Sequence, residues 1–172
     1  MTQVAWQQFL STQGASFDTA SQASFANPVS DQQLYDLSHL GLIAVSGADA
    51  FTFLQGQLTN DIRQVETQAQ FTGYCSPKGR LLGLFYAFYR DEVIFLQCPR
   101  NLIPDLIKRL RMFVLRSKVI IEDVSDQYVT LGLAAPDLTQ ALPDMPSTTH
   151  AIHAQAQGTL IRLHDAAGLQ RG

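Results

Sequence analysis

Cysteine, charge and long hydrophobic runs are all scarce in this chain of 172 residues. The two cysteines are too few for a disulfide framework and do not lie at metal-ligand spacing. Charged residues make up 16% of the chain. Its net charge of −3 does not indicate a nucleic-acid-binding protein, but this net charge does not exclude a local basic site. No run of ~18 apolar residues is present to span a membrane, and the N-terminus lacks the pattern of a signal peptide. We therefore expect a cytoplasmic protein with no membrane contact.

Motifs of the common enzyme classes are missing as well. The chain has no GxGxxG or GxxxxGK[ST] phosphate-binding loop and no GxSxG nucleophile elbow. No two of the four histidines are spaced i, i+4 on a predicted helix, so we expect no metal site. Cys75 and Cys98 lie in apolar segments, where cysteine usually packs as a small hydrophobe. No residue is therefore predicted to be catalytic.

Apolar residues are plentiful, at 46% of the chain, which is enough for one good core or two small ones. Residues 1–33 are the exception, because a short apolar stretch typical of a helix is followed by a segment rich in Ser, Thr, Ala, Gln and Asn. We interpret residues 1–33 as a polar N-terminal arm and residues 34–172 as one domain. The arm would dock through its sparse apolar side chains, Phe17, Phe25 and Val29.

Hydrophobic patterns from residue 34 onward predict a mixture of strands and helices. Strands are expected at residues 42–46, 70–76, 80–90, 93–97, 119–124, 128–134 and 159–163, and helices at residues 48–58, 102–115 and 136–142. Pro77 and Gly79 favour a tight hairpin between the second and third strands. The elements follow no regular βαβ order, which predicts an α+β fold with a mixed, mostly antiparallel sheet and packed helices. Residues 159–163 are expected to form the last strand.

Basic residues cluster between Lys78 and Lys118. This segment contains nine basic and three acidic residues, which gives it a net charge of +6. The rest of the chain therefore carries −9. One interpretation is the solvated face of the helix at residues 102–115. The other is a site for a polyanion, because clustered Lys and Arg raise the local anion concentration and Arg grips carboxylates in a fork. A ligand with several carboxylates fits the size of this cluster better than a long nucleic acid.

Polar residues also gather at the ends of two predicted elements. The group that closes the helix at residues 48–58 and the group at the hairpin are Gln55, Gln57, Thr59, Asn60, Asp61, Tyr74, Lys78, Gly79 and Arg80. They are typical of caps and turns. If the two groups lie close together, however, they supply donors, a carboxylate and an aromatic ring, which suits a flat heterocycle with amide-like edges.

Three stretches of the chain, in this order and at this spacing, match a known pattern. They contain Phe53-Leu54-Gln55-Gly56-Gln57-Leu58-Thr59-Asn60-Asp61-Ile62, Tyr74-Cys75-Ser76-Pro77-Lys78-Gly79-Arg80-Leu81 and Phe113-Val114-Leu115-Arg116-Ser117-Lys118-Val119. Together they resemble the YgfZ/GcvT folate-binding superfamily over residues 34–135. The YgfZ branch fits better than the aminomethyltransferase branch, whose Asp pair corresponds to Gly83 and Leu84 here.

The resemblance implies a GcvT/YgfZ-like domain that binds tetrahydrofolate or a derivative. For the YgfZ branch it further implies a role in iron–sulfur cluster assembly or repair, with iron–sulfur proteins as partners and an indirect effect on tRNA modification. In the hypothesis that follows from it, Asn60 and Asp61 bind the pterin edge and Tyr74 packs against a ring. Lys78 and Arg80 attract the glutamate tail, and Gly79 permits a close backbone approach. Gln57 and Thr59 complete the predicted site.

The match departs from the superfamily in its second half. YgfZ proteins are longer, and their Lys-Gly-Cys-x-x-Gly-Gln-Glu signature has no counterpart here, so we expect a truncated chain that lacks the family's C-terminal half. Two other functions stay open. One is a folate-dependent aminomethyltransferase-like enzyme, which Gly83 and Leu84 argue against. The other is a basic-patch tRNA-binding domain that uses Lys108, Arg109, Arg111 and Arg116.

Overall fold

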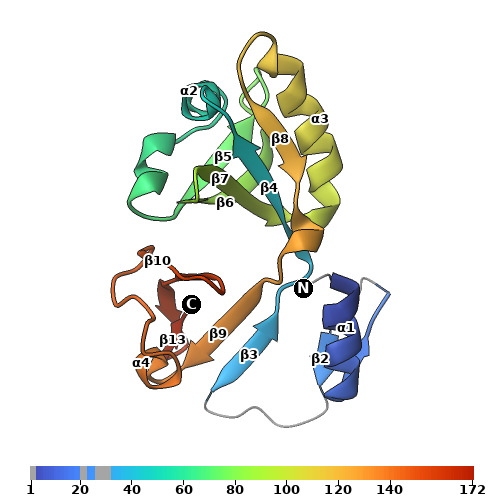
Figure 1. The fold of residues 1–172 in the computed structure, drawn as a ribbon, viewed down its shortest axis with the longest axis vertical. Coiled ribbons are helices and arrows are strands. Elements are labelled where there is room, and N and C mark those ends of the chain that lie inside the picture. Colours follow the sequence, from blue (N-terminus) through green and yellow to red (C-terminus); the bar gives the residue numbers. More distant parts are fainter. Residues whose placement is uncertain (1–2, 20–22, 26–31) are drawn as a thin grey trace. The chain divides into compact units, whose positions relative to one another are not determined.

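The computed structural model describes residues 3–19, 23–25 and 32–172 (Figure 1). Contacts divide the chain into two units, one made of residues 40–125 and one made of the described residues up to 39 together with residues 126–172. The strands of each sheet pair antiparallel in the described part of the chain, and helices accompany them. This arrangement confirms the predicted α+β class. The predicted division into residues 1–33 and 34–172 stays a prediction.

A five-stranded sheet organises the unit of residues 40–125, with the order β5-β6-β7-β4-β8. Its strands are β4 (Leu40–Ser46), β5 (Gln70–Cys75), β6 (Leu81–Arg90), β7 (Val93–Pro99) and β8 (Ile120–Asp123). β5 and β6 form the predicted hairpin, with Gly73 opposite Leu84. β5 has a neighbouring strand only on its β6 side and is therefore an edge of the sheet.

Helices cover one face of this sheet. They are α2 (Ala50–Gln55), the 3-10 helices η1 (Ile62–Glu66) and η2 (Arg100–Leu102), and α3 (Ile103–Val114). Leu106 and Leu110 of α3 are buried in the same core as Phe85 of β6 and Ile43 of β4, and Pro104 occupies the first turn of α3, where its missing N–H costs nothing. The predicted helix at residues 48–58 ends earlier, at Gln55, because the chain that follows pairs with β5.

The other unit holds a four-stranded sheet of order β12-β13-β9-β3 and two hairpins, β1-β2 and β10-β11. Its elements are α1 (Gln3–Thr12), β1 (Ala15–Phe17), β2 (Ala23–Phe25), β3 (Gln33–Asp36), the last two residues of the 3-10 helix η3 (Ser125–Gln127), β9 (Leu131–Ala135), α4 (Leu138–Ala141), β10 (Ile152–Ala154), β11 (Thr159–Ile161), β12 (Leu163–Ala166) and β13 (Leu169–Arg171). Trp6 of α1 is buried and donates a hydrogen bond to Asp36 Oδ1 at 3.0 Å. The predicted docking residue Val29 and the side chain of Phe25 lie outside the described residues.

The end of the chain differs from the prediction that residues 159–163 form the last strand. β12 and β13 follow, and β13 pairs with β9. Ala167 and Gly168 join them with φ of 53° and 77°, which is the backbone of a tight hairpin turn. The sparse apolar residues of this segment gave no strand pattern, and only Gly168 signalled the turn.

Within the described residues, no helix is long and apolar enough to cross a membrane. The same residues contain no group of three or more His, Cys, Asp or Glu side chains that could hold a metal ion.

Gly83 lies where β6 passes beneath α3. A Cβ atom at this position would lie 3.1 Å and 3.2 Å from the two methyl carbons of Leu106. The neighbouring Leu84 points to the opposite side of the strand and is 51% exposed. A carboxylate at position 83 would therefore press against the buried Leu106 side chain, whereas position 84 could carry one in solvent.

We expect Gly83→Asp to destabilise the protein by about 3 kcal/mol or more, because it buries an unpaired carboxylate against Leu106. The matched control Leu84→Asp places the same group in solvent and should cost about 1 kcal/mol or less. Urea unfolding of the two variants tests this difference. Equal midpoints for the two would show that α3 does not pack on Gly83 as described.

Candidate functional site

The chain that follows α2 attaches to the free edge of β5. Thr59 N–H donates to the Gly73 carbonyl at 2.9 Å, and Gly73 N–H donates to Thr59 Oγ1 at 2.8 Å. Asn60 N–H donates to Thr72 Oγ1 at 3.3 Å. A Cβ atom on Gly73 would lie 3.2 Å from Thr59 Oγ1, so the absent side chain helps the two segments to approach. The polar residues after α2 are thereby held in line along β5.

Asp61 is fixed through its backbone surroundings. Its carbonyl accepts a hydrogen bond from Gln70 Nε2 at 2.8 Å, and Gln70 is buried. The next N–H, that of Ile62, donates to Gln55 Oε1 at 3.0 Å. Two glutamine side chains, one from α2 and one from β5, therefore set the position from which the Asp61 carboxylate projects.

The Asp61 carboxylate receives a planar pair of donors from Arg63. Arg63 Nε donates to Oδ1 at 3.0 Å and Nη2 donates to Oδ2 at 3.1 Å, while Arg63 N–H also donates to Oδ1 at 3.2 Å as the cap of η1. Hydrogen bonds from the Arg63 side chain, and then from its backbone, lower the pKa of Asp61 below its ordinary value. The carboxylate is thus ionised, exposed to ligands and suited to a fork of two N–H donors.

The hairpin between β5 and β6 presents the basic group of the predicted site. Gly79 N–H donates to the Ser76 carbonyl at 2.8 Å, and Arg80 N–H donates to Ser76 Oγ at 3.1 Å. Gly79 has φ +75°, the left-handed backbone that a three-residue hairpin loop requires. Lys78, Gly79 and Arg80 are all exposed, and no atom would lie within 4 Å of a Cβ on Gly79. The backbone of this loop is therefore open to a ligand.

The two predicted groups lie at opposite ends of β5. Asp61 lies near the Gln70 end, whereas Lys78 follows the Cys75 end. A strand of this length spans about 17 Å, from the rise per residue of an antiparallel sheet. The structure therefore aligns Asp61 and Lys78 along one edge without bringing them into contact. Gln57 and Thr59 lie between the two ends, where Gln57 N–H donates to the carbonyl of Leu54.

Tyr74 differs most from its predicted role. Its side chain is 3% exposed and belongs to the core. Burial raises the pKa of Tyr74, and the nearby positive charge of Arg109 partly offsets that rise. A ring with so little free surface supports β5 from beneath, which leaves little of it for stacking on a ligand.

Three residues that the sequence did not single out shape this site. They are Arg63, Gln70 and Thr72. The Asp-x-Arg spacing of residues 61 and 63 was a usable signal, because a residue two positions after a cap lies within reach of it. The roles of Gln70 and Thr72 depend on strand pairing, which the local pattern does not reveal.

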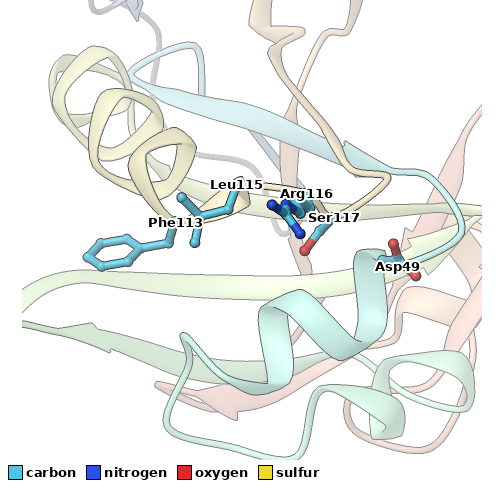
Figure 2. Close-up of a pocket in the computed structure, with 5 residues that line it drawn as sticks. All are labelled: Asp49, Phe113, Leu115, Arg116 and Ser117. Atoms are coloured by element: carbon cyan, nitrogen blue, oxygen red, sulfur yellow. The ribbon is translucent and has the colours of Figure 1, made fainter.

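A second feature of the same unit is an open depression of about 750 Å³ at the end of α3, lined by Asp49, Phe113, Leu115, Arg116 and Ser117 (Figure 2). Phe113 and Leu115 form its apolar part, and the other three residues form its polar part.

Cys98 is buried in the core of this unit, and burial raises its pKa to about 12, so its thiol stays protonated at neutral pH.

Comparison with protein families gives one match that covers most of the chain. The model described as "GCVT N-terminal domain" matches residues 4–160. A "tRNA-modifying protein YgfZ" from Yersinia pseudotuberculosis is 31% identical over 133 residues, which are 74% of this chain and 40% of that protein. The protein of the same name from Vibrio vulnificus is 34% identical over 130 residues, 74% of this chain and 39% of that protein. The chain thus spans about 40% of the length of these curated relatives.

A solved structure shares the fold. It is the glycine cleavage system aminomethyltransferase T from Bartonella henselae, with a TM-score of 0.76 and 18% sequence identity. The match covers 95% of this chain and 50% of that protein. At this identity the likeness shows a common fold and carries no statement about activity.

We expect the variant Arg63→Met to raise the pKa of Asp61 toward its ordinary value of 3.8, because the hydrogen bonds from the arginine side chain are lost. A lowered pKa in the folded state stabilises the protein above the unfolded pKa and loses that contribution as the pH falls. The variant should therefore lose less stability on acidification than the wild type. Carboxyl NMR titration measures the shift.

Asp137 provides the internal control, because hydrogen bonds from Thr139 lower its pKa independently of Arg63. Its titration should be the same in both proteins. An unchanged pKa for Asp61 in Arg63→Met would mean that the fork does not form in solution.

Proposed function

Because the chain belongs to the GCVT N-terminal domain family, we propose that it binds a reduced folate, tetrahydrofolate or a derivative, along the free edge of β5. The family match and the YgfZ relatives confirm the superfamily to which residues 34–135 were assigned. The residues that bind the folate are our proposal, and it is supported by the geometry of Asp61, the hairpin and the segment between them.

The observation that carries this proposal is the fork between Arg63 and Asp61. The pterin of folate presents a ring N–H and a 2-amino group side by side on one planar edge. Arg63 offers Asp61 the same pattern, two parallel N–H donors in one plane at 3.0 Å and 3.1 Å. The pterin edge would therefore take the place of the guanidinium, while Arg63 turns into solvent. Because an exposed ion pair is worth about 1 kcal/mol or less, this exchange costs little.

The hairpin suits the other end of the ligand. Lys78 and Arg80 are exposed, and neither forms an ion pair with any carboxylate in the described part of the chain. They are placed to attract the glutamate carboxylates of a folate whose pterin lies at Asp61. The separation of the two groups along β5 matches a ligand that is long and carries different chemistry at its two ends.

The residues between the two ends complete the proposed contacts. The Asn60 Oδ1 atom accepts a hydrogen bond from Thr59 Oγ1 at 3.1 Å, which leaves the Asn60 amide nitrogen free to donate to a pterin oxygen. Gln57 lies beyond Thr59 on the way to the hairpin, and Gly79 permits the ligand to approach the backbone. Tyr74 acts as the buried support beneath β5.

Aminomethyl transfer is the weaker candidate for this chain. The carboxylate pair expected of such an enzyme falls on Gly83 and Leu84, and Leu106 fills the space above Gly83. We propose instead a folate-binding role of the YgfZ type in the cytoplasm, linked to the upkeep of iron–sulfur proteins and, through them, to the tRNA modification after which the relatives are named.

Calorimetric titration with 5-formyltetrahydrofolate tests the proposal. We expect Asp61→Asn to weaken binding about 10- to 100-fold, because a charge-assisted pair of hydrogen bonds is lost. Lys78→Gln should weaken it about two- to fivefold, as expected for an exposed ionic contact. Arg63→Met should tighten binding by up to about fivefold, because the internal competitor for Asp61 is removed.

Arg90→Gln removes a cation that pairs with Asp91 at the β6–β7 turn, and it serves as the charge-matched control with unchanged affinity. Binding by Asp61→Asn that equals binding by the wild type, or a wild-type chain that gives no heat, contradicts the proposed site.

A further inference from the structure

The turn that ends α3 holds a leucine in a conformation that favours glycine. Ser117 N–H donates to the Val114 carbonyl at 2.8 Å, which closes a four-residue turn. Leu115, the second residue of this turn, has φ 47° and ψ −105°. These angles are close to those of a type II′ turn, where glycine dominates this position because a Cβ atom is strained there.

The Leu115 side chain is not buried, so packing does not offset this backbone strain. Leu115 is 88% exposed, and the preceding Met112 and Phe113 are 56% and 46% exposed. Three large apolar side chains therefore face solvent within four residues, around a backbone that is itself unfavourable for one of them. An exposed apolar cluster of this kind is typical of a binding surface.

The turn is also held rigidly on its far side. Lys118 N–H donates to Asp49 Oδ2 at 2.7 Å, and Asp49 N–H donates to the Lys118 carbonyl at 3.3 Å. A Cβ atom on Gly47 would lie 2.2 Å from that carbonyl, so Gly47 is needed for this approach. The apolar side chains are thus presented by a preorganised loop, which lowers the entropy cost of binding.

Basic residues adjoin these apolar side chains in the sequence. No acidic residue occurs between Leu106 and Ile121, whereas five basic residues do, and all five are exposed: Lys108, Arg109, Arg111, Arg116 and Lys118. Arg111 donates to the Ile121 carbonyl. Across the ranges that the structure describes, none of the five forms an ion pair with a carboxylate. We call these five residues, together with Met112, Phe113 and Leu115, the α3 patch.

The composition of the α3 patch selects among anionic ligands. The charge alone suits a polycarboxylate, but a polycarboxylate has no flat apolar surface that could pack on Phe113 and Leu115. An anionic membrane would need a broad basic face, and the rest of the chain outside residues 78–118 carries −9. Single-stranded nucleic acid combines phosphates with flat apolar bases, which are the two chemistries that the patch presents.

The depression beside the patch adds hydrogen-bonding groups to this match. Figure 2 shows Phe113 and Leu115 on one side and Asp49 on the other, with Arg116 and Ser117 between them. A base that lies on the apolar side could donate its amino group toward Asp49, while its phosphate contacts Arg116. An acyl chain or a row of carboxylates would gain nothing from the Asp49 carboxylate.

We propose that the α3 patch binds single-stranded nucleic acid, with a base on Phe113 and Leu115 and phosphates on Arg116 and the neighbouring cations. The site differs from the folate site of β5 in its residues and its ligand chemistry. It stands whether or not the chain binds folate.

Fluorescence anisotropy with a labelled 12-nucleotide single-stranded RNA of mixed sequence tests the proposal. A single-stranded DNA of the same sequence shows whether the α3 patch prefers RNA or DNA. We expect both single strands to bind more tightly than the corresponding duplex. The logarithm of the affinity should fall with the logarithm of the salt concentration with a slope of about −3.5, as expected for the five cations of the α3 patch on a single strand.

Three variants separate stacking from charge. Phe113→Ser should weaken binding by about fivefold to a hundredfold and leave the salt slope unchanged, because it removes a stacking surface. Arg116→Gln should make the slope shallower by about 0.7. Leu115→Gly should raise the urea midpoint, because glycine suits the turn, and yet weaken binding. Arg90→Gln is the charge-matched control with unchanged affinity.

Several results would overturn the proposal. Unchanged affinity in both Phe113→Ser and Leu115→Gly would show that only the charge of the α3 patch contributes to binding and that its apolar side chains do not. Competition by poly-L-glutamate as strong as that of the RNA itself would assign the patch to polycarboxylates. Preferential binding to vesicles of phosphatidylserine, lost in Leu115→Gly, would assign it to a membrane surface.

Discussion

The attachment of Thr59 and Asn60 to the free edge of β5 is the constraint on which the candidate folate site depends. An edge strand leaves N–H and C=O groups unpaired, and here the chain that leaves α2 satisfies part of that edge through the Thr59 backbone and hydroxyl. A helix end and a hairpin that are far apart in the sequence thereby share one edge of the sheet. Without this pairing, Asp61 would be an ordinary cap of η1, with no fixed relation to Lys78.

The same unit separates two kinds of ligand chemistry. At β5 the exposed groups are a carboxylate and amides in a fixed line, with cations at one end, which suits a single rigid heterocycle with an anionic tail. At the end of α3 the exposed groups are large apolar side chains among cations, which suits repeated bases and phosphates. Each proposed site has a local cost, which is the ion pair that the pterin would displace at Asp61 and the backbone strain at Leu115. Such costs are common where structure serves binding.

Much of the sheet was predictable from the sequence, because its cues are local. Alternating and continuous apolar runs predicted β4 to β8, and Pro77 with Gly79 predicted the hairpin. Non-local effects account for the differences. The helix after β4 ends at Gln55 because the following residues pair with β5, and Tyr74 is buried because helices cover its face of the sheet. The predicted site residues lie along one edge, but the partner of Asp61 was missed because pairing with Arg63 requires the turn into η1.

A crystal structure of the chain with 5-formyltetrahydrofolate tests the central claim most directly. The account predicts that the ring N–H and the 2-amino group of the pterin donate to Asp61 in the place that Arg63 holds now, with the glutamate carboxylates near Lys78 and Arg80. A folate bound elsewhere, with the fork between Arg63 and Asp61 intact, would contradict it.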